Sequence, residues 1–238
     1  FWPGPLTLVL PMRADCPAHD LVTAGLDTLA VRMPSGPMSA LAATLNTPVA
    51  APSANRSGRI SATSAQAVYE ELGNRVDMIL DDGPTLVGVE STIVRVTGKE
   101  VSLLRAGGIT KESIARVVGR TIHAIEPTTG VQAPGMMTSH YAPDMPVRLN
   151  AAEVLAHEAV LAFGPDMPSG ADGAALLINL SPSGDLAEAA QNLFAAMRAA
   201  NASPARALAV APIPETGLGA AINDRLRRAA APRDGHDG

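Results

Sequence analysis

The stretch PVAAPSANRSGRISATSAQAVYEEL, residues 48–72, shows the pattern on which the fold class depends. Its apolar start, Pro48–Ala51, predicts a short strand, and Ser64–Leu72 predicts a helix. Between them lies a polar loop rich in serine, glycine and asparagine. A strand that leads through a short loop into a helix is typical of α/β proteins.

The same alternation continues over the first half of the chain. Ser61 or Thr63 is expected to cap the helix just described, with Glu70 and Glu71 on its solvent side. An α/β domain is therefore predicted over residues 1–120. Its other strands are expected at Leu6–Leu10, Thr28–Met33, Val76–Leu80, Ser91–Val96 and Val101–Leu104, and its other helices at Met38–Leu45 and Lys111–Val118, the last with Thr110 as N-cap and Gly119 as its end.

Residues 121–146 have a different composition, because Pro, Gly, Thr and Ser occur there without a sustained period. They predict a linker or a long loop. The alternation resumes in residues 147–232, which predict a second domain, and residues 233–238 predict a frayed tail. The strands of this second domain are expected at Ala159–Phe163, Ala174–Ile178 and Ala207–Ala211, and its helices at Leu186–Ala200 and Ala220–Ala230. The arginines of the last helix lie near its C-terminal end, where they suit the helix dipole.

Composition excludes several classes of protein. The chain has 238 residues, 47% of them hydrophobic, which is enough for a globular core. A net charge of −5 and only 3% aromatic residues argue against a nucleic-acid-binding module. A single cysteine allows no internal disulfide and predicts a reducing, cytoplasmic location. No apolar run reaches the ~18 residues of a membrane span, so no membrane partner is expected.

The loop APSANRSGRIS, residues 51–61, is the strongest candidate for ligand binding. Its backbone N–H groups can form an anion-binding nest, and Ser53, Asn55, Ser57 and Ser61 can add hydrogen bonds. The alternative is an ordinary Ser/Gly loop that caps the next helix. On composition alone the ordinary loop is the more common arrangement.

Two arginines lie at the ends of predicted apolar strands, where they could bind anions. Arg32 in VRMP and Arg105 in LLRAGG are each followed by a turn residue, and a guanidinium there can bind a carboxylate or a phosphate. The alternative is an arginine that reaches the surface from a buried strand. In GVESTIV, Ser91 and Thr92 follow a glycine and can bind a small polar ligand, although threonine is also common at strand starts.

His140 and Tyr141 lie in the expected linker. Tyr141 can stack on a base or bond a phosphate, or it can simply anchor the loop by packing. Five histidines and one cysteine show no zinc-ligand spacing, and neither a P-loop lysine motif nor a dinucleotide-binding glycine pattern is present.

Taken together, these stretches resemble the YrdC-type L-threonylcarbamoyladenylate synthases. FWPGPLTLVL, VRMPSGP, APSANRSGRIS, GVESTIV and LLRAGGIT occur in the order found in that family. APGMMTSHYAP and PETGLGAAINDRLRRAA are similar to the linker and last helix of its two-domain form. The resemblance spans nearly the whole chain. It implies a twisted open α/β sheet, a linker that crosses the active face as a lid, and a smaller Rossmann-like domain.

The resemblance also implies an activity. Such enzymes join L-threonine, bicarbonate and ATP into L-threonylcarbamoyladenylate and release pyrophosphate. The product feeds synthesis of N6-threonylcarbamoyladenosine (t6A) in tRNA, so tRNA or t6A-transfer proteins are expected partners. Positioning and charge stabilisation carry this chemistry without a protein nucleophile. Mg²⁺ would arrive on the triphosphate, and the sequence names no protein ligand for it.

The family pattern assigns roles to particular positions. By this resemblance Arg32 binds the threonine carboxylate, while Ala51 and Ser91 line the threonine pocket. A second group contacts ATP, with Tyr141 closing over the nucleotide from the linker and Asn55 organising the loop. This ATP-binding group consists of Thr28, Ser53, Asn55, Ser61, Arg105 and Tyr141.

The chain departs from the family in two places. The first residues, FWPGPLTLVLP, include no initiator Met, and the basic N-terminal section of the family is absent here. We therefore expect this chain to bind ATP poorly and to turn over little. Met137, Thr138 and Ser139 stand where the family linker is basic, which reduces the charge that the lid would bring.

Other functions remain open at this stage. A carbamoyl-adenylate-forming domain of hydrogenase maturation proteins is related, but those proteins embed the domain among others and lack this linker and last helix. A non-catalytic RNA-binding or regulatory YrdC-like module is a different class. The acidic pI of about 5.5 and the few aromatic residues argue against RNA binding.

Overall fold

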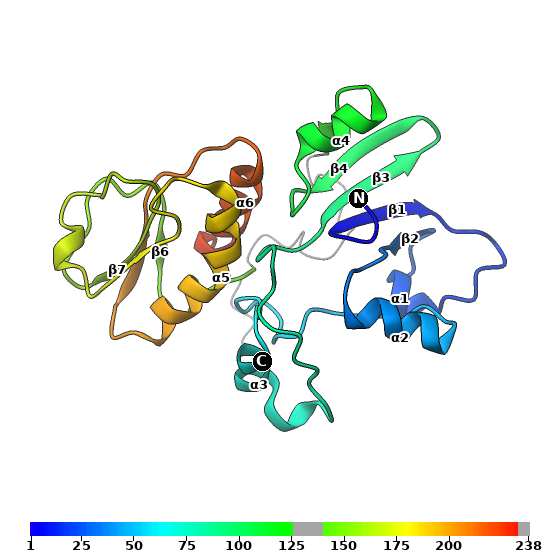
Figure 1. The fold of residues 1–238 in the computed structure, drawn as a ribbon, viewed down its shortest axis with the longest axis horizontal. Helices are drawn as coiled ribbons and strands as arrows, with labels where there is room; N and C mark the ends of the chain where they lie inside the picture. The colour runs from blue at the N-terminus through cyan, green and yellow to red at the C-terminus, as the bar shows by residue number, and fades with distance from the viewer. Residues whose placement is uncertain (126–139, 233–238) are drawn as a thin grey trace. The chain divides into compact units, whose positions relative to one another are not determined.

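The computed structural model describes residues 1–125 and 140–232, and it confirms a mixed α/β chain. The chain divides into two compact units (Figure 1). The first unit combines Phe1–Pro52 with Glu90–Met136, and the second combines Ser53–Val89 with Met137–Gly238. Each unit contains one sheet, so each is described by itself.

The first unit is built on a mixed sheet with strand order β2-β1-β3-β4-β5. The central strand β1 pairs with β2 in antiparallel and with β3 in parallel orientation. β3 and β4 form an antiparallel hairpin, as the sequence predicts. The strands are β1 (Leu6–Pro11), β2 (Thr28–Val31), β3 (Thr92–Thr97), β4 (Glu100–Arg105) and β5 (His123–Ala124), and the helices are α1 (Asp20–Thr23), α2 (Pro37–Leu45) and α4 (Lys111–Val118).

Successive side chains of a strand point to opposite faces of the sheet, and both faces of this sheet are apolar. Leu6, Val94 and Leu103 form one face, and Ile114 of α4 packs on them. Figure 1 shows α4 beside β3 and β4. The hydroxyl of Thr110 caps α4 and accepts a hydrogen bond from the Ser113 backbone N–H at 3.2 Å, so this predicted cap is confirmed. The opposite face is smaller and consists of Val9, Ile93 and Leu104.

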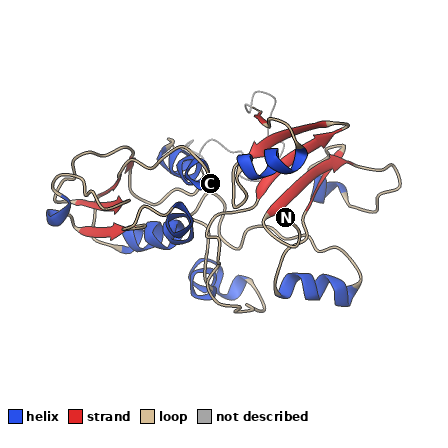
Figure 2. Cartoon of the chain, turned by 45° about the horizontal axis from the view of Figure 1, so that its top comes forward, coloured by secondary structure: helices blue, strands red, loops and turns tan. Residues whose placement is uncertain are grey.

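The second unit contains a fully parallel sheet with strand order β6-β9-β7-β8. All five residues of β7 are buried, as expected for a central parallel strand covered on both faces. Figure 2 shows these strands in red with blue helices beside them. The strands are β6 (Val147–Arg148), β7 (Glu158–Ala162), β8 (Leu176–Asn179) and β9 (Ala207–Val210), and the helices are α3 (Ala65–Leu72), η1 (Gly73–Arg75), η2 (Ala171–Gly173), α5 (Leu186–Ala202) and α6 (Leu218–Ala230).

Two predicted strands are wrong. Pro48–Ala51 is irregular, because prolines at 48 and 52 supply no backbone N–H to a ladder. Val76–Leu80 is also irregular and pairs with no strand of the described chain. Its apolar side chains are mostly exposed, Met78 at 75% and Leu80 at 64%, so no sheet buries them.

The segment that was predicted as a linker contains one short strand, β5, which pairs with β4. Residues 126–139, including Met137, Thr138 and Ser139, lie outside the described residues. The N-cap of α3 is Ser64, whose hydroxyl accepts from the Ala67 N–H at 3.2 Å, and neither Ser61 nor Thr63 takes that role. The compact units are not divided at residue 120, where the first domain was expected to end. That domain boundary stays a prediction.

Candidate substrate-binding site

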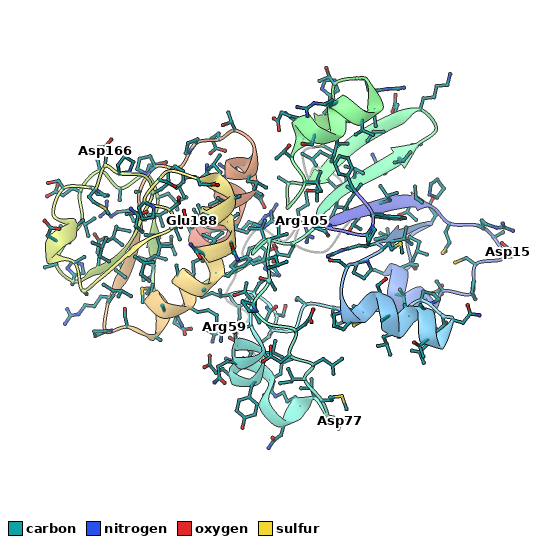
Figure 3. All side chains as sticks on the ribbon, in the orientation of Figure 1. Asp15, Arg59, Asp77, Arg105, Asp166 and Glu188 are labelled. Atoms are coloured by element: carbon teal, nitrogen blue, oxygen red, sulfur yellow. The ribbon has the colours of Figure 1, made fainter. Side chains whose placement is uncertain are left out.

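In the first unit, the GVEST and LLRAGG motifs meet at the ends of β3 and β4. Arg105 is buried, and its Nη2 donates to the Ser91 carbonyl at 2.9 Å and to the Ser91 hydroxyl at 3.3 Å. Its Nε donates to the same carbonyl at 3.2 Å. The structure therefore brings together two of the predicted site residues, one from each motif. Figure 3 labels Arg105 at the end of β4.

A threonine that the sequence reasoning missed completes this cluster. The Thr7 hydroxyl lies 2.7 Å from the Ser91 hydroxyl, because the parallel pairing of β1 with β3 sets Thr7 beside the start of β3. The only sequence signal for it is its place in the family stretch FWPGPLTLVL. Thr7 thus fixes the orientation of a hydroxyl that is expected to bind substrate.

Gly107 allows the two motifs to pack without a gap. A Cβ at this position would lie 2.3 Å from the Glu90 carbonyl oxygen and 2.4 Å from the Thr92 nitrogen, which no real side chain tolerates. The Thr92 hydroxyl is fully buried and bonds to the backbone of Ile109. Thr92 is therefore structural, and Ser91 is the hydroxyl of this pair that remains a candidate for substrate binding.

The remaining predicted site residues of this unit are Thr28, Arg32 and Ala51. Arg32 follows the end of β2, and its Nε donates to the Gly4 carbonyl at 3.0 Å. Desolvation lowers the pKa of Arg32, yet a guanidinium stays charged at neutral pH. Thr28 begins β2 at the opposite end of the strand from Arg32, and Ala51 is exposed.

In the second unit, Asn55 organises the loop Ser53–Ser61. Its Nδ2 donates to the carbonyls of Arg56 at 2.9 Å and Arg59 at 3.2 Å. The side-chain oxygen of Asn55 is buried and accepts no hydrogen bond from the described residues. The Asn55 amide therefore bridges two backbone carbonyls of the loop, and its role toward ATP stays a prediction. Ser61 is also buried, while Ser53 is exposed.

The Ser53–Ser61 loop is held by ion pairs that the sequence did not reveal. Arg56 Nε donates to Glu71 Oε2 at 3.1 Å, and Arg198 of α5 donates to Glu71 Oε1 at 3.1 Å. The expected solvent position of Glu71 is wrong, since its side chain is only 11% exposed. Burial would raise the pKa of Glu71, but the hydrogen bonds from the two arginines outweigh burial and hold the pKa below its usual value.

Tyr141 is buried in the second unit beneath the helices α5 and α6. Its ring lies 5.4 Å from that of Phe194, and the Arg225 guanidinium lies 5.7 Å from its centroid. Arg225 is fully buried, and the last turn of α6 carries Arg227 and Arg228. The backbone N–H of Ala142 donates to the Gly58 carbonyl at 3.0 Å, which ties this segment to the Ser53–Ser61 loop.

No group of three or more His, Cys, Asp or Glu side chains among the described residues is arranged to hold a metal ion. The buried oxygen of Asn55 is of the type that Mg²⁺ accepts as a ligand, because that ion prefers oxygen donors. One buried amide oxygen among the described residues suits an ion that takes most of its ligands from phosphate and water, and Mg²⁺ at this loop stays a prediction.

Comparison with known proteins gives a consistent result over the whole chain. The family model Sua5/YciO/YrdC, described as Telomere recombination, matches residues 1–107. The model described as Threonylcarbamoyl-AMP synthase, C-terminal domain, matches residues 109–231.

Individual relatives agree with those family models. The chain is 36% identical to threonylcarbamoyl-AMP synthases of Bacillus subtilis and Pyrococcus abyssi over 98% of its own length, and it covers 71% and 72% of theirs. A crystal structure of P. abyssi Sua5 complexed with L-threonine matches 97% of this chain and 71% of that one, with a TM-score of 0.82 and 34% identity.

Proposed function

This chain belongs to the threonylcarbamoyl-AMP synthase family, and from that premise we propose that it forms threonylcarbamoyl-AMP and pyrophosphate from L-threonine, bicarbonate and ATP. The observation that carries the proposal is the buried Arg105, which is hydrogen-bonded to Ser91 and joins the two family motifs that are expected to hold the substrates. A buried guanidinium beside a hydroxyl suits an anionic substrate that also has a polar side chain.

The threonine side of the proposed site lies in the first unit. Arg32 would bind the carboxylate, Ser91 would bond the substrate through its hydroxyl, and Ala51 would line the pocket. The solved P. abyssi relative was crystallised with L-threonine, which supports this choice of amino acid. Discrimination against serine would rest on one methyl contact worth about 1–3 kcal/mol.

The family pattern also assigns the residues of the ATP side. Arg105 and Thr28 would contact the nucleotide from the first unit. The Ser53–Ser61 loop would contribute Ser53, Asn55 and Ser61, and Tyr141 would close over the nucleotide. Exposed Ser53 and the available oxygen of Asn55 support the placement of phosphate or its ion at this loop.

The chemistry needs positioning more than it needs a protein acid or base. The threonine amine and bicarbonate form a carbamate and water. A carbamate oxygen then bonds to the α-phosphorus of ATP, the bond from that phosphorus to the β-bridging oxygen breaks, and pyrophosphate leaves. Arg105 would stabilise the charge that develops on the phosphoryl oxygens. Mg²⁺, when bound to the triphosphate beside Asn55, would neutralise the leaving pyrophosphate.

The cellular context is part of the same proposal. The product would pass to the tRNA t6A pathway, with tRNA or t6A-transfer proteins as partners and the cytoplasm as the location. None of the helices in the described residues has the length and hydrophobicity needed to cross a membrane.

The test follows radiolabelled bicarbonate into a threonine- and ATP-dependent adenylate that is identified by its mass. A version extended upstream runs beside this chain, because this chain covers 71% of the length of the Bacillus subtilis relative. Ser91→Ala should abolish the product, while Ser102→Ala, a half-buried serine on β4, should retain it. If neither length makes product although both are folded, the synthase function is wrong. Salt-dependent tRNA binding without ATP would then support the RNA-binding alternative.

A further inference from the structure

Helix α5 presents two polar side chains toward the Ser53–Ser61 loop, all within the second unit. Arg198 and Asn201 are three positions apart, so they lie on one face of the helix. Each one bonds to a carboxylate, and each carboxylate in turn binds an arginine of the loop. Two parallel relays of polar contacts therefore join α5 to the loop. Figure 3 labels Arg59 on the loop and Glu188 on α5.

The first relay runs through helix α3. Arg198 donates to Glu71 at 3.1 Å and to Glu70 at 3.2 Å, and Arg56 of the loop donates to the other oxygen of Glu71 at 3.1 Å. The side chains of Arg198 and Glu71 are 18% and 11% exposed. The Arg56 side chain, which belongs to the loop, is 49% exposed, so salt screens its contact with Glu71 more than it screens the Arg198–Glu71 pair.

The second relay runs through the segment that follows Tyr141. Asn201 Nδ2 donates to the Asp144 carboxylate at 3.1 Å, and the Asp144 backbone N–H donates to Asn201 Oδ1 at 2.5 Å. Asp144 also pairs with Arg59 of the loop. Each arginine of the loop is therefore linked to the same face of α5 through one carboxylate.

Asn55 connects these relays to the proposed nucleotide site. Its Nδ2 donates to the backbone carbonyls of Arg56 and Arg59, the two residues that the relays hold. Fixing those carbonyls fixes the plane of the Asn55 amide, and with it the direction of the oxygen that is available for the ATP-bound ion. The orientation of this oxygen thus depends on side chains of α5.

A further contact shows that α5 also limits the GVEST stretch. Gly88, at a φ of 77°, packs so tightly on α5 that a Cβ would lie 2.1 Å from the Ala190 carbonyl oxygen and 2.3 Å from the Cα of Gln191. The backbone that leads into GVEST therefore rests on the helix that anchors the Ser53–Ser61 loop.

We propose that Arg198 is a positioning residue for the ATP side of the active site, an inference that rests on the proposed function. Arg198 acts through Glu71 and Arg56 and does not touch substrate. The threonine-binding candidates Arg32 and Ser91 belong to the first unit, where Arg32 bonds to the Gly4 carbonyl and the Ser91 hydroxyl lies beside that of Thr7. Loss of Arg198 should therefore weaken ATP use and leave threonine use unchanged.

The experiment compares Arg198→Met and Arg198→Lys with the matched control Arg227→Met, which removes an exposed ion pair of α6 with Glu215. Methionine keeps the apolar stem of Arg198 and removes the charge, and lysine keeps the charge without the planar fork that binds two carboxylates. KM is measured separately for ATP and for threonine. Hydrogen–deuterium exchange follows peptides that cover residues 53–61, whose Arg59 N–H is bonded to the Arg56 carbonyl at 3.1 Å.

For Arg198→Met we expect the KM for ATP to rise about tenfold, with the KM for threonine within about twofold of the parent value. Exchange of the loop peptides should rise, and lysine should restore part of both effects. Unchanged loop exchange overturns the proposal, and so does an equal rise of both KM values with faster exchange throughout the unit. If neither this chain nor the version extended upstream makes product, the proposed function fails, and loop exchange still decides whether Arg198 positions the loop.

Discussion

The two units hold their candidate site residues in different ways. In the second unit β7 is buried along its whole length and α5 buries seven residues, and the Ser53–Ser61 loop is anchored to that helix. In the first unit α2 buries no residue and β2 is at most half-buried. There, Ser91 and Arg105 are held by hydrogen bonds to strand ends. A packed helix therefore supports the candidate residues of the second unit, and a few polar contacts support those of the first.

This difference indicates how each half should respond to substitution. Where packing supports a loop, damage to the core should lower stability first and activity second. Where hydrogen bonds between neighbouring side chains fix the site, single substitutions should change activity with little effect on folding. Four measurements can sharpen or break this contrast.

The largest effect is expected in the core of the second unit. Leu161→Ala, in the fully buried strand β7, should lower the free energy of unfolding by about 2–5 kcal/mol through lost burial and a residual cavity. Leu29→Ala, on the half-buried strand β2, should cost about 1 kcal/mol or less. Urea titrations followed by circular dichroism measure both values. Equal losses would show that the two units do not differ in packing as described.

The next effect concerns activity in the first unit. Arg105→Met should lower kcat/KM by about 10²–10³-fold, because it removes charged hydrogen bonds to Ser91 and the cation proposed for the phosphoryl group. The control Arg116→Met removes an exposed arginine of α4 and should keep the parent rate. Steady-state assays with both substrates measure the change. A loss in both variants would point to a general effect of charge.

A smaller effect is expected from Thr7→Val. Valine keeps the shape of threonine but loses the 2.7 Å contact with the Ser91 hydroxyl. Loss of one such hydrogen bond costs about 0.5–1.5 kcal/mol, so the KM for threonine should rise about 2–10-fold. Thr97→Val, at the exposed end of β3, is the matched control. A rise in the KM for ATP alone would contradict a role of Thr7 in orienting Ser91 for threonine.

The smallest effect is a pH dependence in the second unit. Arg148 donates to the buried Glu158 at 2.6 Å and 3.1 Å, which lowers the pKa of Glu158 although burial opposes the shift. Since the folded pKa lies below the usual 4.5, the pair stabilises the fold above that pH, and the stabilisation is lost as the pH falls through the folded pKa. Such a pair contributes about 1 kcal/mol or less, or about 2–4 °C in Tm.

Thermal melts of the parent and of Glu158→Gln between about pH 3 and pH 7 test this prediction. The two Tm values should differ at neutral pH and converge as the pH falls below 4.5. A constant difference over the whole range would mean that the charge of Glu158 does not contribute.

The elements that the sequence predicted well are those with local signals. α4 spans the predicted residues because Thr110 and Gly119 mark its ends within one turn. The predictions of strands at Pro48–Ala51 and Val76–Leu80 are wrong because a strand forms only where a partner strand lies beside it. A short apolar run does not reveal whether such a partner exists. Ser91 and Arg105 could be named from the family motifs, but their mutual contact depends on the register of distant strands.

The buried position of Glu71 could not be predicted for a similar reason. An isolated α3 would leave this carboxylate in water, whereas in the fold it pairs with Arg56 and with Arg198, which lies 127 positions further along the chain. The sequence carries no local mark of such a pairing, because the chemistry of a surface glutamate and a paired glutamate is the same until the chain folds.

The single tryptophan gives a fluorescence signal that comes from one unit of the molecule only. Trp2 lies in the first unit, where its indole N–H donates to the Leu6 carbonyl at 2.7 Å, close in sequence to Gly4, which accepts from Arg32. Both tyrosines, Tyr69 and Tyr141, lie in the second unit. Selective excitation of the indole therefore reports on the first unit alone. The unfolding of the first unit can then be followed from indole emission without a label.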